Sequence, residues 1–236
     1  MRRDSSTVVV LVGEVPAPLL TELARSPNVS LVRPPEEEQD GLTAAATALG
    51  QAAHRASPFV LVTADPLAEV AAQWRAMWDL SAGPRGPAGF EARAAEALSA
   101  WRAGRFEFPD YYLVLAPVRT SAARTSAARN SAPGNTAARN SAARNSAARN
   151  SGTGPDLYLG PLRAARPRRV EAVVTADEDG QASQVLQALR ALQHGPWWPP
   201  LDELIDTARR FFAGGLAEGE GTLAAPTISP PGKPGG

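Results

Sequence analysis

The amino-acid sequence predicts an α/β protein with a three-layer, doubly wound and mainly parallel five-stranded sheet, Rossmann-like or flavodoxin-like. Two observations predict this class. Short β-branched runs alternate with longer segments of helical spacing, which is typical of βαβ units. Two of the runs are also nearly continuously apolar, as strands covered on both faces are. Because crossovers between parallel strands are right-handed almost without exception, helices are expected on both faces of the sheet.

The five predicted strands are the β-branched runs themselves. They span Thr7–Val12, Val29–Val32, Pro58–Thr63, Asp110–Pro117 and Arg169–Thr175. In a doubly wound sheet, ligands bind beyond the carboxyl ends of the strands. The loops expected to matter for function are therefore those that follow the strands, at Gly13–Pro16, Arg33–Asp40, Thr63–Pro66, Val118 onward and Thr175–Gly180.

Three segments carry apolar side chains at the spacing of a core-facing helix. Their stripes are Leu67, Val70, Ala71, Trp74, Met77 and Trp78; Phe90, Ala94, Ala97, Leu98 and Trp101; and Leu201, Leu204, Ile205, Ala208, Phe211 and Phe212. A loop rich in Gly and Pro at Ser81–Gly89 separates the first two helices. The tryptophans at 74, 78 and 101 are therefore expected in the core, not in a stacking platform.

Between the fourth and fifth strands, five-residue units of Ser, Ala, Arg and Asn repeat from Thr120 to Gly154. These residues offer no apolar side chain larger than a methyl group to offset a backbone entropy cost of about 1–2 kcal/mol per residue. The sequence predicts a disordered insert at 120–154 within one domain formed by 1–119 and 155–213, and a disordered Gly/Pro-rich tail at 214–236. The five arginines of the repeat predict only weak, non-specific nucleic-acid contact.

Composition excludes several classes of chemistry. The chain has no cysteine, which excludes disulfides, thiolate zinc sites, iron–sulfur clusters and thiol nucleophiles. No segment approaches the roughly 20 apolar residues of a membrane helix, and the apolar run near the N-terminus is too short for a signal peptide. We expect a cytoplasmic protein without membrane contact. A single lysine, Lys233, stands beside 23 arginines, and we interpret this arginine excess as the background of a GC-rich coding sequence.

Standard nucleotide-binding and catalytic motifs are missing. Neither GxGxxG nor GxxxxGK[ST] occurs, and no cofactor is evident. His54 and His194 each end a helical segment, which places them at the amino edge of the sheet. That position leaves no histidine for a Ser-His-Asp triad at the carboxyl edge.

Three acids, Glu14, Asp65 and Asp177, follow the first, third and fifth strands. Carboxylates at this edge suit Mg²⁺, whose preferred ligands are hard oxygens, and would support phosphoryl chemistry. Helix capping is the competing interpretation and the stronger one. Asp65 followed by Pro66 is the pattern of a helix start, and Asp177 or Asp179 can cap the next helix in the same way.

Two adjacent tryptophans, Trp197 and Trp198, precede a proline pair before the last predicted helix. The prolines restrict how the chain enters that helix. One tryptophan is expected to seal the core. The other is a candidate for an exposed partner-binding surface, because aromatic side chains are enriched in such surfaces.

Two functions remain open from the sequence. The first is a binding or protein-interaction module without a standard catalytic motif, whose partner is a protein or a small molecule. The alternative is a metal-dependent hydrolase or phosphotransfer enzyme that holds Mg²⁺ with Glu14, Asp65 and Asp177. Convergence of these carboxylates on one ion would favour the enzyme, whereas carboxylates turned onto their own helices would favour the module.

Overall fold

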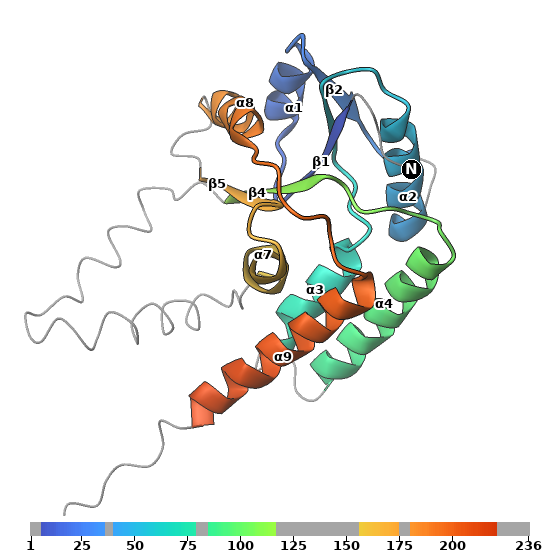
Figure 1. Ribbon diagram of the computed structural model, residues 1–236, viewed down its shortest axis with the longest axis vertical. Coiled ribbons are helices and arrows are strands. Elements are labelled where there is room, and N and C mark those ends of the chain that lie inside the picture. The colour runs from blue at the N-terminus through green and yellow to red at the C-terminus, as the bar shows by residue number, and fades with distance from the viewer. Residues whose placement is uncertain (1–5, 36–39, 79–84, 117–155, 175–179, 221–236) are drawn as a thin grey trace, which may run out of the picture.

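The computed structural model describes residues 6–35, 40–78, 85–116, 156–174 and 180–220 (Figure 1). The predicted disordered insert at 120–154 lies outside the described residues, as does the tail from 221 onward. Helix α9 spans Leu201–Glu220, so it continues past Gly214, where the tail was predicted to begin. The described helices and strands are all consistent with the predicted α/β class.

The five strands form one parallel sheet, and each lies where the sequence predicts it. They are β1 Thr7–Val12, β2 Val29–Val32, β3 Phe59–Val62, β4 Tyr111–Ala116 and β5 Val170–Val174. The strand order is β2-β3-β1-β4-β5. Since β3 and not β2 lies beside β1, this is neither the usual Rossmann order nor the flavodoxin order.

Helices cover both faces of the sheet, which confirms the predicted three layers. Helices α1 (Ala17–Ala24) and α8 (Gln181–Ala191) pack on one face. The other face carries α2 (Gly41–Ala53), α3 (Ala68–Met77), α4 (Arg85–Arg102), α9 and a π-helical turn, η2 (Tyr158–Leu162). A short helix, α7 (Arg163–Ala165), follows η2 and leads toward β5.

Each face of the sheet has its own core, and β1 contributes to both. Val8 and Val10 point into the larger core, whereas Val9 and Leu11 point into the smaller one. This explains why the strand is apolar at every position, since alternate side chains are buried on opposite faces. In the larger core Trp74 is fully buried.

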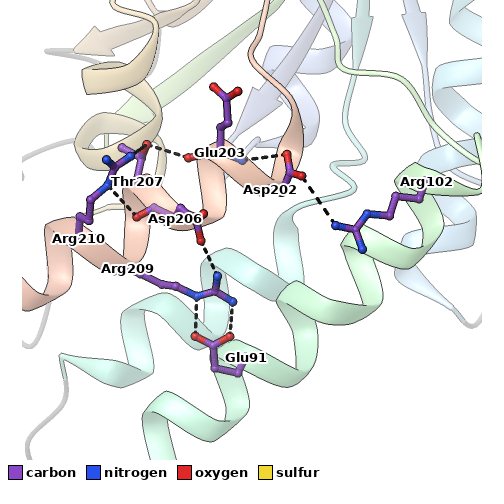
Figure 2. A network of polar contacts seen from close by, with 8 residues as sticks. All are labelled: Glu91, Arg102, Asp202, Glu203, Asp206, Thr207, Arg209 and Arg210. Carbon is purple, nitrogen blue, oxygen red and sulfur yellow. Dashed lines mark hydrogen bonds and ion pairs between the residues drawn. The ribbon is translucent and has the colours of Figure 1, made fainter.

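Helix α9 is attached to the larger core by apolar burial, and ion pairs reinforce it at the surface (Figure 2). Arg209 makes two hydrogen bonds to Glu91 of α4, at 2.9 and 2.5 Å, and a third to Asp206 at 2.6 Å. The hydrogen bonds from Arg209 hold the pKa of Glu91 below its usual value. Pairs this exposed contribute about 1 kcal/mol or less. Burial of the apolar stripe, Leu201, Leu204, Ile205 and Ala208, is therefore the main attachment.

Substitution of Trp74 tests the larger core. Its ring lies 5.7 Å from both Trp78 and Phe90, so Trp74→Ala should lower the free energy of unfolding by about 3–5 kcal/mol. Trp78 is only partly buried, and Trp78→Ala should cost less. Urea unfolding followed by circular dichroism measures both, and equal costs would contradict this packing.

Deletion of the repeat tests whether the fold depends on it. The repeat residues are Ser, Ala, Arg and Asn, with Thr, Pro and Gly, and they carry no large apolar side chain that could join a core. Removing Thr120–Gly154 and joining Arg119 to Pro155 should therefore leave the free energy of unfolding nearly unchanged, because loop-closure entropy varies by only about 0.6 kcal/mol per doubling of loop length. Urea unfolding of the shortened chain provides the measurement. A loss of several kcal/mol would show that the repeat contributes to the folded core.

Candidate functional site

The segment that joins α8 to α9, residues 192–200, crosses from one face of the sheet to the other (Figure 1). We call it the crossover segment. It has no regular secondary structure, so its backbone carbonyls need other donors. Five successive carbonyls each accept a hydrogen bond from a side chain: Gln193 from Tyr111 Oη, His194 from Arg168 Nη1, Gly195 from Arg169 Nη2, Pro196 from Arg169 Nε and Trp197 from Arg166 Nε.

Arg169 is the central donor of this arrangement. Its side chain is buried, and it also donates to the Asp110 carbonyl at 3.1 Å. The guanidinium carbon lies 4.9 Å from the centre of the Tyr111 ring and 5.1 Å from that of Trp197. No described acid lies within ion-pair distance of it. Arg166, Arg168 and Arg169 thus have structural roles, and the interpretation of the arginine excess as the background of a GC-rich coding sequence stays a prediction.

A cavity of about 750 Å³ lies against the crossover segment. Thr7, Tyr111 and Arg169 line it at the points where β1, β4 and β5 begin, so it occupies the amino edge of the sheet. The sequence predicts ligand binding at the opposite edge, beyond the carboxyl ends of the strands. The rest of the wall combines four aromatic side chains, four polar or charged side chains, one glycine and two prolines: Trp101, Phe108, Trp197 and Trp198; Ser6, Glu107, Asp110 and His194; Gly195; and Pro199 and Pro200.

The two adjacent tryptophans have different environments, as the sequence predicts. Trp198 is buried, donates from Nε1 to the Pro109 carbonyl at 2.8 Å and stacks on Phe108. Trp197 is 51% exposed. Both line the cavity, and a partner-binding role for either stays a prediction.

Both histidines lie near the ends of helices, at the amino edge where the sequence places them. His54 follows the last residue of α2 and is exposed. His194 follows α8 and lines the cavity. The edge that was expected to leave the histidines away from any ligand is thus the edge that carries the cavity of about 750 Å³.

The predicted N-cap is wrong in position: Leu67, not Asp65, is the N-cap residue of α3, which begins at Ala68. Asp65 still turns its carboxylate onto the chain just before this helix. Its carboxylate accepts a hydrogen bond from the Leu67 amide at 3.0 Å, in the turn that precedes α3. The same carboxylate also accepts a hydrogen bond from the Tyr158 hydroxyl of η2. Beside Asp65 there is only a hollow of about 50 Å³. Asp65 is therefore engaged by its own turn and by η2.

The other two candidate acids do not complete a metal site within the described residues. Glu14 is exposed in the loop after β1. Asp177 lies outside the described residues, together with Asp179. No group of three His, Asp or Glu side chains in the described part of the chain could hold a metal ion. Convergence of Glu14, Asp65 and Asp177 therefore stays a prediction.

Two tyrosines surround Asp65, and sequence reasoning gave no signal for either. The Tyr112 and Tyr158 rings lie 5.2 Å apart, and both side chains are buried. Burial raises the pKa of Asp65 to about 6, although the hydrogen bonds from Tyr158 and Leu67 act in the opposite direction. Burial and the nearby Asp65 carboxylate raise the pKa values of both tyrosines. The partly buried Asp65 and the two buried tyrosines form a polar cluster between β3, β4 and η2.

Comparison of the chain with protein-family models, with curated proteins and with solved structures finds no match. Within the described residues, none of the helices has the length and apolar character required to cross a membrane. Functional inference therefore rests on the chain's own residues.

The raised pKa of Asp65 predicts how stability depends on pH. Because its folded pKa is about 6 and its usual value is 3.8, the folded state binds more protons than the unfolded state between about pH 4 and 6. Stability should fall as the pH rises through this window, by about 3 kcal/mol at most. Asp65→Asn keeps an acceptor for Leu67 and does not titrate, so it should lose this component of the pH dependence.

Urea unfolding of the wild type and the variant at each pH isolates the contribution of Asp65. Tyr158→Phe removes a hydrogen bond that lowers the pKa of Asp65 and should move the window to higher pH. Identical profiles for the wild type and Asp65→Asn would show that Asp65 is not perturbed by burial.

Proposed function

We propose that this protein is a binding module that takes an apolar, aromatic ligand in the cavity at the amino edge of the sheet. The observation that carries the proposal is the half-exposed Trp197 at a cavity of about 750 Å³ whose wall includes four further aromatic side chains, those of Trp101, Phe108, Tyr111 and Trp198. Small-molecule sites are typically concave and about 300–1,000 Å³ in volume, with apolar walls and polar groups that orient the ligand. The cavity matches this volume and offers both kinds of group.

Two side chains of the cavity wall are already held in place before a ligand binds. Trp198 is held by its bond to the Pro109 carbonyl and by stacking on Phe108. Arg169 is held by three carbonyl acceptors from two segments of the chain. A site whose side chains are already immobilised loses less conformational entropy when a ligand binds. This rigidity supports binding of a small ligand in preference to a large flexible partner.

The metal-dependent alternative has less support, because Asp65 is turned onto the start of α3 and onto Tyr158, as expected of a module. A rise in melting temperature with Mg²⁺ that Asp65→Asn abolishes would restore that alternative. The cytoplasmic location and weak nucleic-acid contact through the repeat at 120–154 remain predictions, and the repeat lies outside the described residues.

A neutral aromatic probe tests the proposed function. 2-Naphthol should bind the wild type and shift the indole N–H resonance of Trp197 in NMR spectra, because the exposed ring offers a stacking surface. Trp197→Ala should weaken binding by about tenfold or more, in line with loss of an aromatic contact. Isothermal titration calorimetry measures the affinities.

The matched control is Phe211→Ala. Phe211 is the other large apolar side chain exposed in the described residues, and it does not line the cavity. Its removal should leave 2-naphthol affinity unchanged. Equal losses in the two variants would indicate non-specific adsorption to exposed aromatic side chains, and the proposed site would be wrong.

A further inference from the structure

We propose that the ligand of this cavity is a planar aromatic monoanion, with its carboxylate held by Arg169. This inference rests on the proposed function and adds the chemical class of the ligand. The relevant observation is a buried guanidinium that lines an aromatic cavity and whose described hydrogen-bond partners are all neutral carbonyls.

Arg169 carries a positive charge in a buried side chain. A buried charge is costly unless an opposite charge or several hydrogen bonds compensate it. Carbonyls from Asp110, Gly195 and Pro196 accept three of the five guanidinium N–H groups. They do not neutralise the positive charge, and no described acid forms an ion pair with it. Two N–H donors are therefore left without a partner among the described residues, on a side chain that lines the cavity.

The neighbouring arginines strengthen the positive potential at this edge. Arg166 donates to the Trp197 and Ala165 carbonyls, and Arg168 donates to the His194 carbonyl. Neither forms an ion pair with a described acid. Three guanidinium charges therefore gather around the crossover segment with carbonyl partners only. An anion near them gains favourable interaction energy that a neutral ligand of the same shape does not.

Two acids limit the ligand to a single negative charge. Glu107 and Asp110 also line the cavity. Asp110 accepts a hydrogen bond from the Val8 amide at 2.7 Å, and Glu107 has an interaction partner of its own. Both carboxylates would repel a second anionic group. One carboxylate also matches the remaining donors of one guanidinium, whereas a phosphate dianion demands more donors than Arg169 has left.

The aromatic wall supplies the remaining specificity. Trp101, Phe108 and Trp197 line the cavity with Pro199 and Pro200, and Trp197 offers its exposed surface beside the guanidinium. Flat rings bury apolar area against such walls and favour offset-stacked or edge-to-face contacts. An aliphatic acid of similar size would lose these contacts. The recognised shape is therefore planar and the recognised charge is minus one.

The test compares probes that share one ring system and differ in charge. Isothermal titration calorimetry at neutral pH with the full chain should give at least about tenfold tighter binding of 2-naphthoate than of neutral 2-naphthamide, the size expected for a charge-assisted hydrogen bond. The dianion naphthalene-2,6-dicarboxylate and the cation 2-naphthylmethylammonium should both bind more weakly than 2-naphthoate. This series uses only the wild type, so it does not depend on the folding of any variant.

Two arginine variants test whether Arg169 causes the preference for 2-naphthoate over 2-naphthamide. Arg169→Lys keeps a positive charge but loses the planar set of donors, and it should remove most of the preference for 2-naphthoate over 2-naphthamide. Arg168→Lys is the matched control, because Arg168 also donates to a crossover carbonyl but does not line the cavity. The preference should survive in that variant.

The outcomes separate this inference from the proposed function. Equal binding of 2-naphthoate and 2-naphthamide, both weakened by Trp197→Ala, would keep the proposed function and overturn the anion inference. Tightest binding of the cation would overturn it in favour of Glu107 and Asp110 as the recognition groups. A preference for 2-naphthoate lost equally in Arg168→Lys and Arg169→Lys would also overturn the assignment to Arg169. Absence of binding by every probe would overturn both proposals.

Discussion

The side-chain hydrogen bonds to the crossover segment are the interaction around which the amino-edge cavity is built. Helix α8 packs on one face of the sheet and α9 on the other, so residues 192–200 must pass around the amino ends of the strands. That path gives the carbonyls of 193–197 no β-ladder partners, and these residues are mostly exposed, so water could also donate to them. Side chains donate to all five instead. The donors Tyr111 and Arg169 thereby hold the segment that forms one wall of the cavity.

Arginine suits this task for a physical reason, and the same reason gives the cavity its chemistry. One guanidinium holds several donors in a rigid plane, so Arg169 joins the crossover segment to β4 through carbonyls on both. A lysine ammonium offers three donors from a single atom and does not match that geometry. Because the acceptors are neutral, the positive charge persists after the structure is satisfied. The hydrogen bonds of Arg169 to backbone carbonyls thus leave its positive charge beside the aromatic side chains of the cavity.

The strands could be predicted from the sequence, whereas the strand order and the cavity could not. Burial on both faces makes β1 and β3 continuously apolar, which a sequence reveals directly. Strand order depends on which neighbours each crossover joins, and no local pattern records this. The donors Arg166, Arg168 and Arg169 acquire their role only once the path of the crossover segment is known. Likewise Tyr158 meets Asp65 across a separation of 93 residues. From the sequence, only the contact of Asp65 with the chain near the start of α3 could be predicted, and the N-cap itself is Leu67.

The described parts of the two sheet edges differ. At the carboxyl edge, Asp65 lies in a polar cluster beside a hollow of about 50 Å³, and parts of the loops after β2, β4 and β5 lie outside the described residues. The amino edge carries the cavity of about 750 Å³, and Pro199 and Pro200, which precede α9, form part of its wall. A ligand that binds only the folded state stabilises it by about 2.7 kcal/mol at a concentration of 100 Kd. Since the cavity requires the crossover segment in place, occupancy of the proposed site would oppose any opening that detaches α9, and it would link binding to the integrity of the larger core.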